Sequence, residues 1–300
     1  MTAVFLSLLT AAAAAQSQGE SAEPPAVDSS PQQLPNLPPV TVRTPAELEH
    51  RVGRFIWKAT SDTWQGDESV PLWHGPICPL VAGRPRKEGQ FVFDHLSDIL
   101  TSVGAGMGQT GCRPNFFVIF TAQPEALLNT AWERNDRLFG DQGGAHEFID
   151  TPRPVRIWYN AELVGADGRA SSSAAAAAMF GNGGSSVPVI KIAPIGRSEF
   201  GVVQQITSII AVVDIRRVVG LDLRQLTDYV AMAGLTKVAL DGDYRDAPTI
   251  LRLFTASGED RPTSLSPWDE AFLKELYRTD QKSKNQRQDV ARGMIADLSP

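Results

Sequence analysis

Two short apolar runs constrain the fold of this chain more than any other feature. The segment NFFVIFTA at residues 115–122 is apolar almost throughout, and a second run, IIAVVD, ends at Asp214. A strand with one face in water alternates apolar and polar residues, whereas a continuous apolar run is typical of a strand buried in the middle of a sheet. The sequence therefore predicts a buried sheet with these two segments among its strands.

The remaining segments add helices and further strands around this centre. Thr44, Pro45 and Glu47 form a capping box with proline at the first helical position, and Ser266 with Asp269 forms a second capping pattern. Helices are predicted at 45–59, 88–105, 123–135 and 222–235, with two more between 266 and 298 that are broken near residue 280. Strands or extended segments are predicted at 73–83, 153–163, 187–195 and 204–215. This order favours an α+β fold, a mixed β-sheet with packed helices that is closed by C-terminal helices, over a regular βαβ series.

The first forty residues differ in character from the rest. Residues 1–15 contain a short apolar core followed by an A-x-A cleavage pattern, which predicts a signal peptide and therefore export to the periplasm or cell envelope. Residues 16–39 are rich in proline and poor in large apolar side chains, which predicts a disordered linker. We expect a single α+β domain over residues 40–300, interrupted by a low-complexity loop at 168–186 that ends in glycines.

Cys78 and Cys112 are the two cysteines of the chain. In an exported protein an even number of cysteines favours a disulfide, and the pair lacks the CxxC spacing of a redox site. A bridge that closes a loop of this length is worth roughly 3–4 kcal/mol in the chain-entropy model. No run after the predicted signal peptide reaches the roughly 18 apolar residues of a membrane span, so no transmembrane segment is predicted.

Composition and spacing argue against several classes of chemistry. The net charge is −6 and no basic cluster precedes the last residues, so a nucleic-acid partner is not predicted. The four histidines are too far apart in sequence to suggest a zinc site, and His146 in AHEFID has Asp150 where a second histidine would be needed. No nucleophile elbow, dinucleotide loop or phosphate loop is present. Neither a metal nor a cofactor is therefore predicted.

Carboxylates are the remaining candidates for chemistry. Asp214 stands at the end of a buried strand, a frequent place for catalytic groups, but the preferred interpretation is that the chain emerges into solvent there. The segment DGDYRD at 241–246 lacks the ligand order of a calcium loop and is predicted to be a polar turn. His95 is expected on the exposed side of its helix, in contact with solvent.

Several segments together carry a resemblance to a known group of proteins. The series PLWHGPICPLVAGRPR, GCRPNFFVIFTAQPEALL, TPRPVRIWYN, LTDYVAMAGL, APTILRLF and LSPWDEAFLKELY resembles an uncharacterised family of exported Gram-negative bacterial proteins, over about residues 70–297. A fainter similarity is to zincin-like metallopeptidase domains, in which a helix carries His-Glu-x-x-His. At the matching positions this chain has Asp228, Tyr229 and Met232, which cannot supply the metal ligands and the general base of that motif.

The helix that carries these residues also has a purely structural interpretation. Leu223, Leu226, Val230 and Ala233 form a stripe that is expected to face the core. Arg224, Asp228 and Ala231 lie on the opposite face, and Asp222 can cap the start of the helix, with Gln225 three residues on. Tyr229 flanks the stripe, so its ring is expected to pack while its hydroxyl reaches a polar partner.

The sequence therefore predicts a non-catalytic exported protein, a binding or envelope-associated module whose partner is an unknown envelope protein or a small ligand. The alternative is a carboxylate-dependent hydrolase or metallopeptidase-like enzyme. Its weak catalytic candidates are Asp214, Asp228 and Tyr229, which would then have to converge in one pocket. A third possibility is an inhibitor or assembly factor in which residues 168–186 become ordered on binding a partner.

Overall fold

The computed structural model describes residues 44–61, 70–139, 144–164, 203–283 and 285–299. The predicted signal peptide, the linker, the low-complexity loop at 168–186 and the strand predicted at 187–195 lie outside these residues. The helices are α2 (Pro45–Ala59), α3 (Arg86–Ser102), α4 (Pro124–Arg134), α5 (Ala145–Asp150), α7 (Leu223–Leu235), α8 (Pro267–Arg278) and α9 (Gln286–Leu298). The strands are β1 (Leu72–Trp73), β2 (Pro79–Ala82), β3 (Phe116–Thr121), β4 (Val155–Val164) and β5 (Val203–Asp214).

These strands form one mixed, mostly parallel sheet, which confirms the predicted α+β class. Followed from neighbour to neighbour, the strand order is β1-β5-β3-β2, and β4 also pairs with β5. β1, β2, β3 and β5 run parallel, whereas β4 is antiparallel to β5 over its whole length, with a register shift between Asn160 and Ala161. The two apolar runs are therefore neighbours in the middle of the sheet, with Phe116 opposite Ile209 and Thr121 opposite Asp214.

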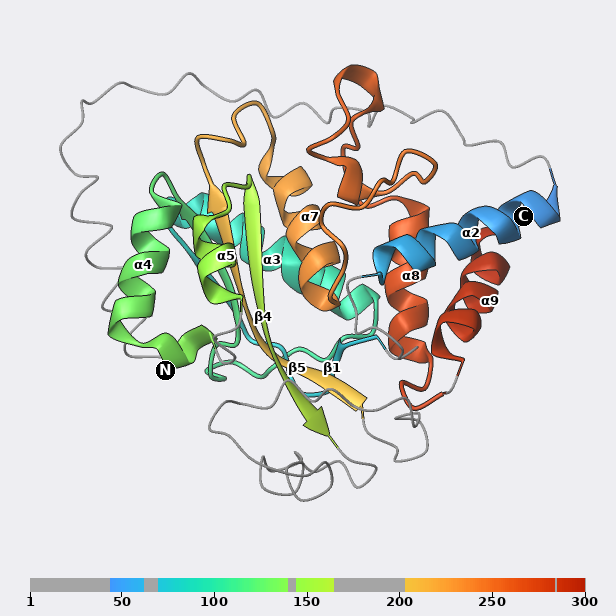
Figure 1. The fold of residues 1–300 in the computed structure, drawn as a ribbon, viewed down its shortest axis with the longest axis horizontal. Helices are drawn as coiled ribbons and strands as arrows, with labels where there is room; N and C mark the ends of the chain where they lie inside the picture. Colours follow the sequence, from blue (N-terminus) through green and yellow to red (C-terminus); the bar gives the residue numbers. More distant parts are fainter. Residues whose placement is uncertain (1–43, 62–69, 140–143, 165–202, 284, 300) are drawn as a thin grey trace.

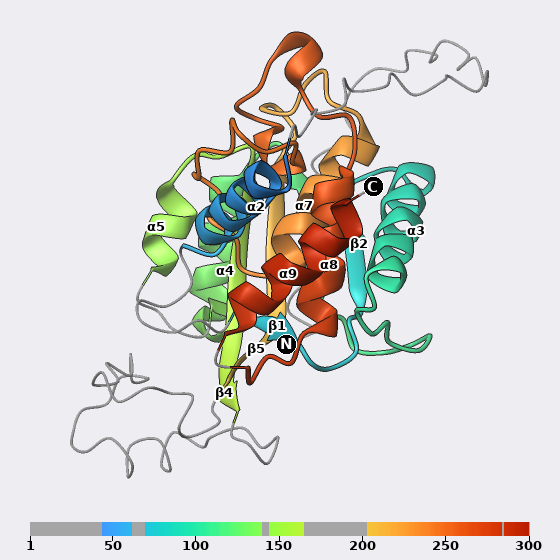
Figure 2. The ribbon, with the colours of Figure 1, turned by 90° about the vertical axis from the view of Figure 1, so that its right-hand side faces the viewer.

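Helices cover both faces of the sheet, and this explains why the central strands are apolar throughout. Along β3, Phe116, Val118 and Phe120 belong to one buried cluster, and Phe117 and Ile119 belong to another. The first cluster contains residues of α2, α3, α7, α8 and α9, and the second contains residues of α4 and α5. Figures 1 and 2 show α4 and α5 on one side of the sheet, with α3, α7 and the C-terminal helices on the other.

The local capping signals read from the sequence are present at the helix ends. Asp222 and Gln225 form a reciprocal capping box at the start of α7, and Ser266 and Asp269 form one at the start of α8. Thr44 accepts a hydrogen bond from the backbone N–H of Glu47 at the start of α2. Each cap satisfies backbone groups that the first helical turn leaves unpaired.

The predicted disulfide between Cys78 and Cys112 is present, with the two Cα atoms 6.1 Å apart. Cys78 directly precedes β2, and Cys112 lies four residues before β3 begins at Phe116. A Cβ added to Gly108 would overlap both sulfur atoms, so the bridge packs closely against the backbone there. The bridge ties together the starts of two neighbouring parallel strands, as the sequence indicated.

The packing of α7 differs from the amphipathic pattern that the sequence predicts. Asp228 and Ala231, expected on the outer face, are 2% and 0% exposed, and the helix is buried from Gln225 to Leu235. The reason is that α3 packs along α7, and the segment around Leu265 reaches Asp228. Gly234 allows close contact with the sheet, because a Cβ there would overlap Phe116 and Ile209. None of the helices in the described ranges combines the length and the apolar character required to cross a membrane.

Candidate functional site

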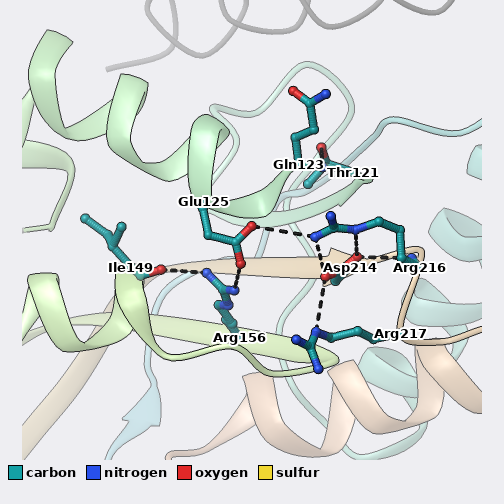
Figure 3. A network of polar contacts seen from close by, with 8 residues as sticks. All are labelled: Thr121, Gln123, Glu125, Ile149, Arg156, Asp214, Arg216 and Arg217. Carbon is teal, nitrogen blue, oxygen red and sulfur yellow. Dashed lines mark hydrogen bonds and ion pairs between the residues drawn. The ribbon is translucent and has the colours of Figure 1, made fainter.

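The carboxyl ends of β2, β3 and β5 reach the same edge of the sheet. In sheets built from parallel strands, ligands bind outside these ends, where the chain leaves each strand as a loop. Arg84 follows β2, Thr121 ends β3, and Asp214 ends β5. β4 begins at this same edge, because Val155 pairs with Val213. We call the linked charged residues Glu125, Arg156, Asp214, Arg216 and Arg217 the strand-end network (Figure 3).

Asp214 is the anchor of this network and is 0% exposed. One carboxylate oxygen accepts hydrogen bonds from the backbone N–H and from Nε of Arg216, each at 3.0 Å. The other oxygen accepts a bond from Nη2 of Arg216 at 3.0 Å and lies 3.4 Å from Nε of Arg217. The chain does reach the surface directly after this strand, at Arg216 and Arg217, but Asp214 itself stays buried because the two arginines enclose its carboxylate.

This environment fixes the charge state of Asp214. Burial by itself raises the pKa of the carboxyl, but the hydrogen bonds from Arg216 and the charges of Arg216 and Arg217 outweigh it, so the pKa lies below its ordinary value. The carboxylate is ionised at neutral pH, and both of its oxygens are already bonded. A carboxylate in this state positions other groups and is poorly placed to accept a proton in a reaction.

Glu125 extends the network to the buried strand β4. Its carboxylate pairs with Nη2 of Arg156 and lies 3.6 Å from Nη2 of Arg216. The Arg156 side chain is 1% exposed and also donates from Nη1 to the carbonyl oxygen of Ile149 at 2.7 Å. Burial raises the pKa of Glu125, but its own backbone N–H and the two arginines outweigh this effect and lower it. Figure 3 shows Glu125 lying between Arg156 and Arg216.

Two buried polar atoms near this edge of the sheet have no hydrogen-bond partner among the described residues. They are Nε of Arg156 and Nε of Arg84, whereas Oε2 of Glu88 pairs with Nη2 of Arg84. The described residues contain only two other such side-chain atoms, both near the start of α9.

A glycine fixes the position of Arg84 in this arrangement. Gly83 has φ +80°, a left-handed conformation that favours glycine, and a Cβ there would overlap the carbonyl oxygen of Phe120. The chain can therefore turn sharply at the end of β2 while it remains against β3. The guanidinium group of Arg84 consequently lies 5.8 Å from the centre of the Phe120 ring.

A second polar pair joins α3 to α7. Nε2 of His95 lies 2.6 Å from Oδ1 of Asp228, and Oδ2 of Asp228 accepts a hydrogen bond from the backbone N–H of Leu265 at 2.9 Å. The His95 side chain is 16% exposed, so the prediction that it is solvated is wrong. The ring is stacked on Phe91, and its polar partner, Asp228, lies on α7.

Tyr229 lies apart from both clusters. Its ring packs edge-on against Phe254, with 4.7 Å between the ring centres, and burial raises its pKa above the ordinary value. The expected polar partner of its hydroxyl is absent among the described residues. Within the described part of the chain, no hydrogen bond or ion pair joins Asp214, Asp228 and Tyr229, and each of them has different partners.

His146, His74 and the acidic segment at 241–246 make contacts that support the fold. His146 lies on the short helix α5 and packs against Trp132, and His74 contacts Gln281. The segment 241–246 is a turn, in which Asp243 pairs with Arg245. Within the ranges that the structure describes, no group of three or more His, Cys, Asp and Glu side chains could hold a metal ion.

Sequence reasoning identified only one member of the strand-end network, Asp214. It did not single out Glu125, Arg156, Arg216 or Arg217. The available signal was the pair of arginines that follows Asp214 in DIRR, directly after a buried strand. Glu125 and Arg156 carry no such signal, since they reach the network only through the sheet topology.

Comparison with known proteins gives no additional guidance. No family model, no curated protein and no solved structure matches the chain.

Proposed function

We propose that this protein is an exported, non-catalytic binding module whose ligand site is the strand-end network. The observation that carries the proposal is the pair of half-exposed arginines, Arg216 and Arg217, that lie against the buried carboxylate of Asp214 at the carboxyl end of β5. Export is supported by the disulfide between Cys78 and Cys112, because such bridges persist in oxidising compartments, and by the apolar N-terminal segment with its cleavage pattern. Association with the cell envelope is part of the same proposal.

A binding role fits the state of the carboxylates better than hydrolysis does. Asp214 and Asp228 are 0% and 2% exposed, and both oxygens of each already contact N–H groups or His95. A general base must lie within hydrogen-bond reach of the proton it takes from the substrate, and neither buried carboxylate is accessible to one. Tyr229 is 4% exposed and cannot compensate, because its raised pKa keeps it protonated.

The proposal is tested by a ligand screen followed by mapping. The intact chain is screened by thermal shift against matched sets of acidic, basic and neutral small molecules, and each compound that stabilises it is titrated by NMR. We expect at least one compound to shift the amide signals of Thr121, Glu125 and Arg216. If no compound binds, or if all shifts map to other parts of the molecule, the strand-end network is not a ligand site.

A further inference from the structure

We propose that the ligand is acidic, and that the side chains of Arg216 and Arg217 bind its carboxylate or phosphate group. This inference rests on the proposed function, because it names the class of ligand for the same site. Arginine presents a planar set of N–H donors that matches the oxygens of these groups and binds them with paired hydrogen bonds.

Asp214 holds the two arginines side by side. The same oxygen, Oδ2, lies 3.0 Å from Nη2 of Arg216 and 3.4 Å from Nε of Arg217. The carboxylate is buried, but the two arginine side chains are 56% and 49% exposed. Hydrogen bonds to Asp214 therefore fix Arg216, an ion pair holds Arg217 beside it, and the outer ends of both side chains are accessible to a ligand.

The outer donors are unused. Among the described residues, Nη1 of Arg216 and both Nη atoms of Arg217 have no hydrogen-bond partner. Figure 3 shows the Nη atoms of Arg217 directed away from Asp214. Thr121 adds a hydroxyl group beside Asp214, and its oxygen accepts from the backbone N–H of Gln123 at 3.0 Å while its own proton remains available.

The local charge also favours an acidic ligand. Three guanidinium groups, those of Arg156, Arg216 and Arg217, share two carboxylates, those of Asp214 and Glu125. One positive charge is therefore left at this edge, although the whole chain carries a net charge of −6. An anion that binds here would meet both the excess charge and donors whose orientation is already fixed, which reduces the entropy lost on binding.

The structural alternative is that the arginines only neutralise Asp214. A second pair in the chain shows what neutralisation alone requires. Asp243 and Arg245 repeat the same local geometry, with the backbone N–H, Nε and Nη2 of the arginine on the carboxylate at 3.2, 3.0 and 2.7 Å. That pair is exposed and has a single arginine. One arginine is therefore enough to pair with a carboxylate in this geometry. Arg217 is not needed for that pairing, and binding of a ligand would account for its position.

Arg217→Ala and the matched control Arg245→Ala provide the test. Asp214 keeps all three hydrogen bonds from Arg216 in the first variant, so the fold is preserved, and thermal unfolding checks this. Inorganic phosphate and succinate are titrated into each intact protein by calorimetry, in sodium chloride at constant ionic strength. We expect phosphate or succinate to bind the wild type and R245A equally, and R217A at least about tenfold more weakly. Comparison of the two ligands shows whether phosphate or carboxylate is preferred.

The outcomes separate the two proposals. Equal binding by R217A and the wild type, or no binding of either anion to the wild type, overturns the assignment of an acidic ligand. If the screen described above still finds neutral or basic compounds that shift the signals of Thr121 and Arg216, the ligand site remains and only its chemistry is wrong. If it finds none, both proposals fail.

Discussion

His95 on α3 and Asp228 on α7 form a polar pair, with 2.6 Å between the imidazole nitrogen and the carboxylate oxygen. The two residues are separated by 133 positions in the sequence. The pair joins two helices that pack on the same face of the sheet. The Asp228 carboxylate is bonded on both oxygens, by His95 and by the N–H of Leu265.

Replacement of Asp228 by alanine should destabilise the protein. The N–H of Leu265 and the ring of His95 both lose their partner, and the N–H would be left without a hydrogen bond in a partly buried place. We expect the free energy of unfolding in urea to fall by about 2–3 kcal/mol. Asp98→Ala, at an exposed position of α3, is the control and should change it by less than about 0.5 kcal/mol. A similar small effect for both variants would show that the pair is not structurally important.

The contribution of Asp214 to stability should depend on pH. Because its pKa in the folded protein lies below the ordinary value of 3.8, the folded state favours the ionised form. The stabilisation is therefore present above about pH 4 and is lost as the pH falls further. We expect Asp214→Asn to lower the free energy of unfolding by about 2 kcal/mol at neutral pH, a value reduced by the solvent exposure of both arginines. The difference between variant and wild type should shrink in acid, and a pH-independent difference would contradict this.

Asp269 should show the opposite dependence. Its carboxyl group is 0% exposed, and burial raises its pKa from 3.8 to about 6 despite four hydrogen bonds from Thr249, Ile250 and Ser266. The folded state therefore favours the protonated form, so stabilisation is present below about pH 4 and is lost as the pH rises through 6. The free energy of unfolding of the wild type, measured against Asp269→Asn at each pH, should fall by roughly 3 kcal/mol across this interval. A flat difference would mean that the pKa is not raised.

Gly83 should tolerate no side chain. Alanine there would need a left-handed backbone and would overlap the carbonyl oxygen of Phe120. We expect Gly83→Ala to lower the free energy of unfolding by about 2 kcal/mol or more, measured by chemical denaturation. Gly53→Ala is the matched control, because Gly53 lies in α2 with open space around it, and alanine should stabilise that helix by roughly 0.5–1 kcal/mol. Equal effects of the two substitutions would refute the argument.

Most of the elements could be predicted because their signals are local. The apolar runs at β3 and β5, the capping residues Asp222 and Ser266, and the bridge between Cys78 and Cys112 were all recognisable in the sequence, and the structure contains each of them. Such signals arise from backbone groups and side chains within a few positions of one another, so they do not depend on how the chain folds at long range.

The partners of the polar side chains could not be predicted in the same way. Periodicity marks the stripe of α7 that faces the sheet, but it does not show that α3 and the segment at Leu265 cover the other side, which buries Asp228. In the same way, Arg156 appears as an ordinary strand residue until the antiparallel pairing of β4 with β5 brings it to the edge where Asp214 and Glu125 lie. The sequence by itself determined most of the secondary structure, the disulfide and the two buried strands. Only the tertiary structure decided which charges meet, because strand order and helix packing join residues that no local pattern connects.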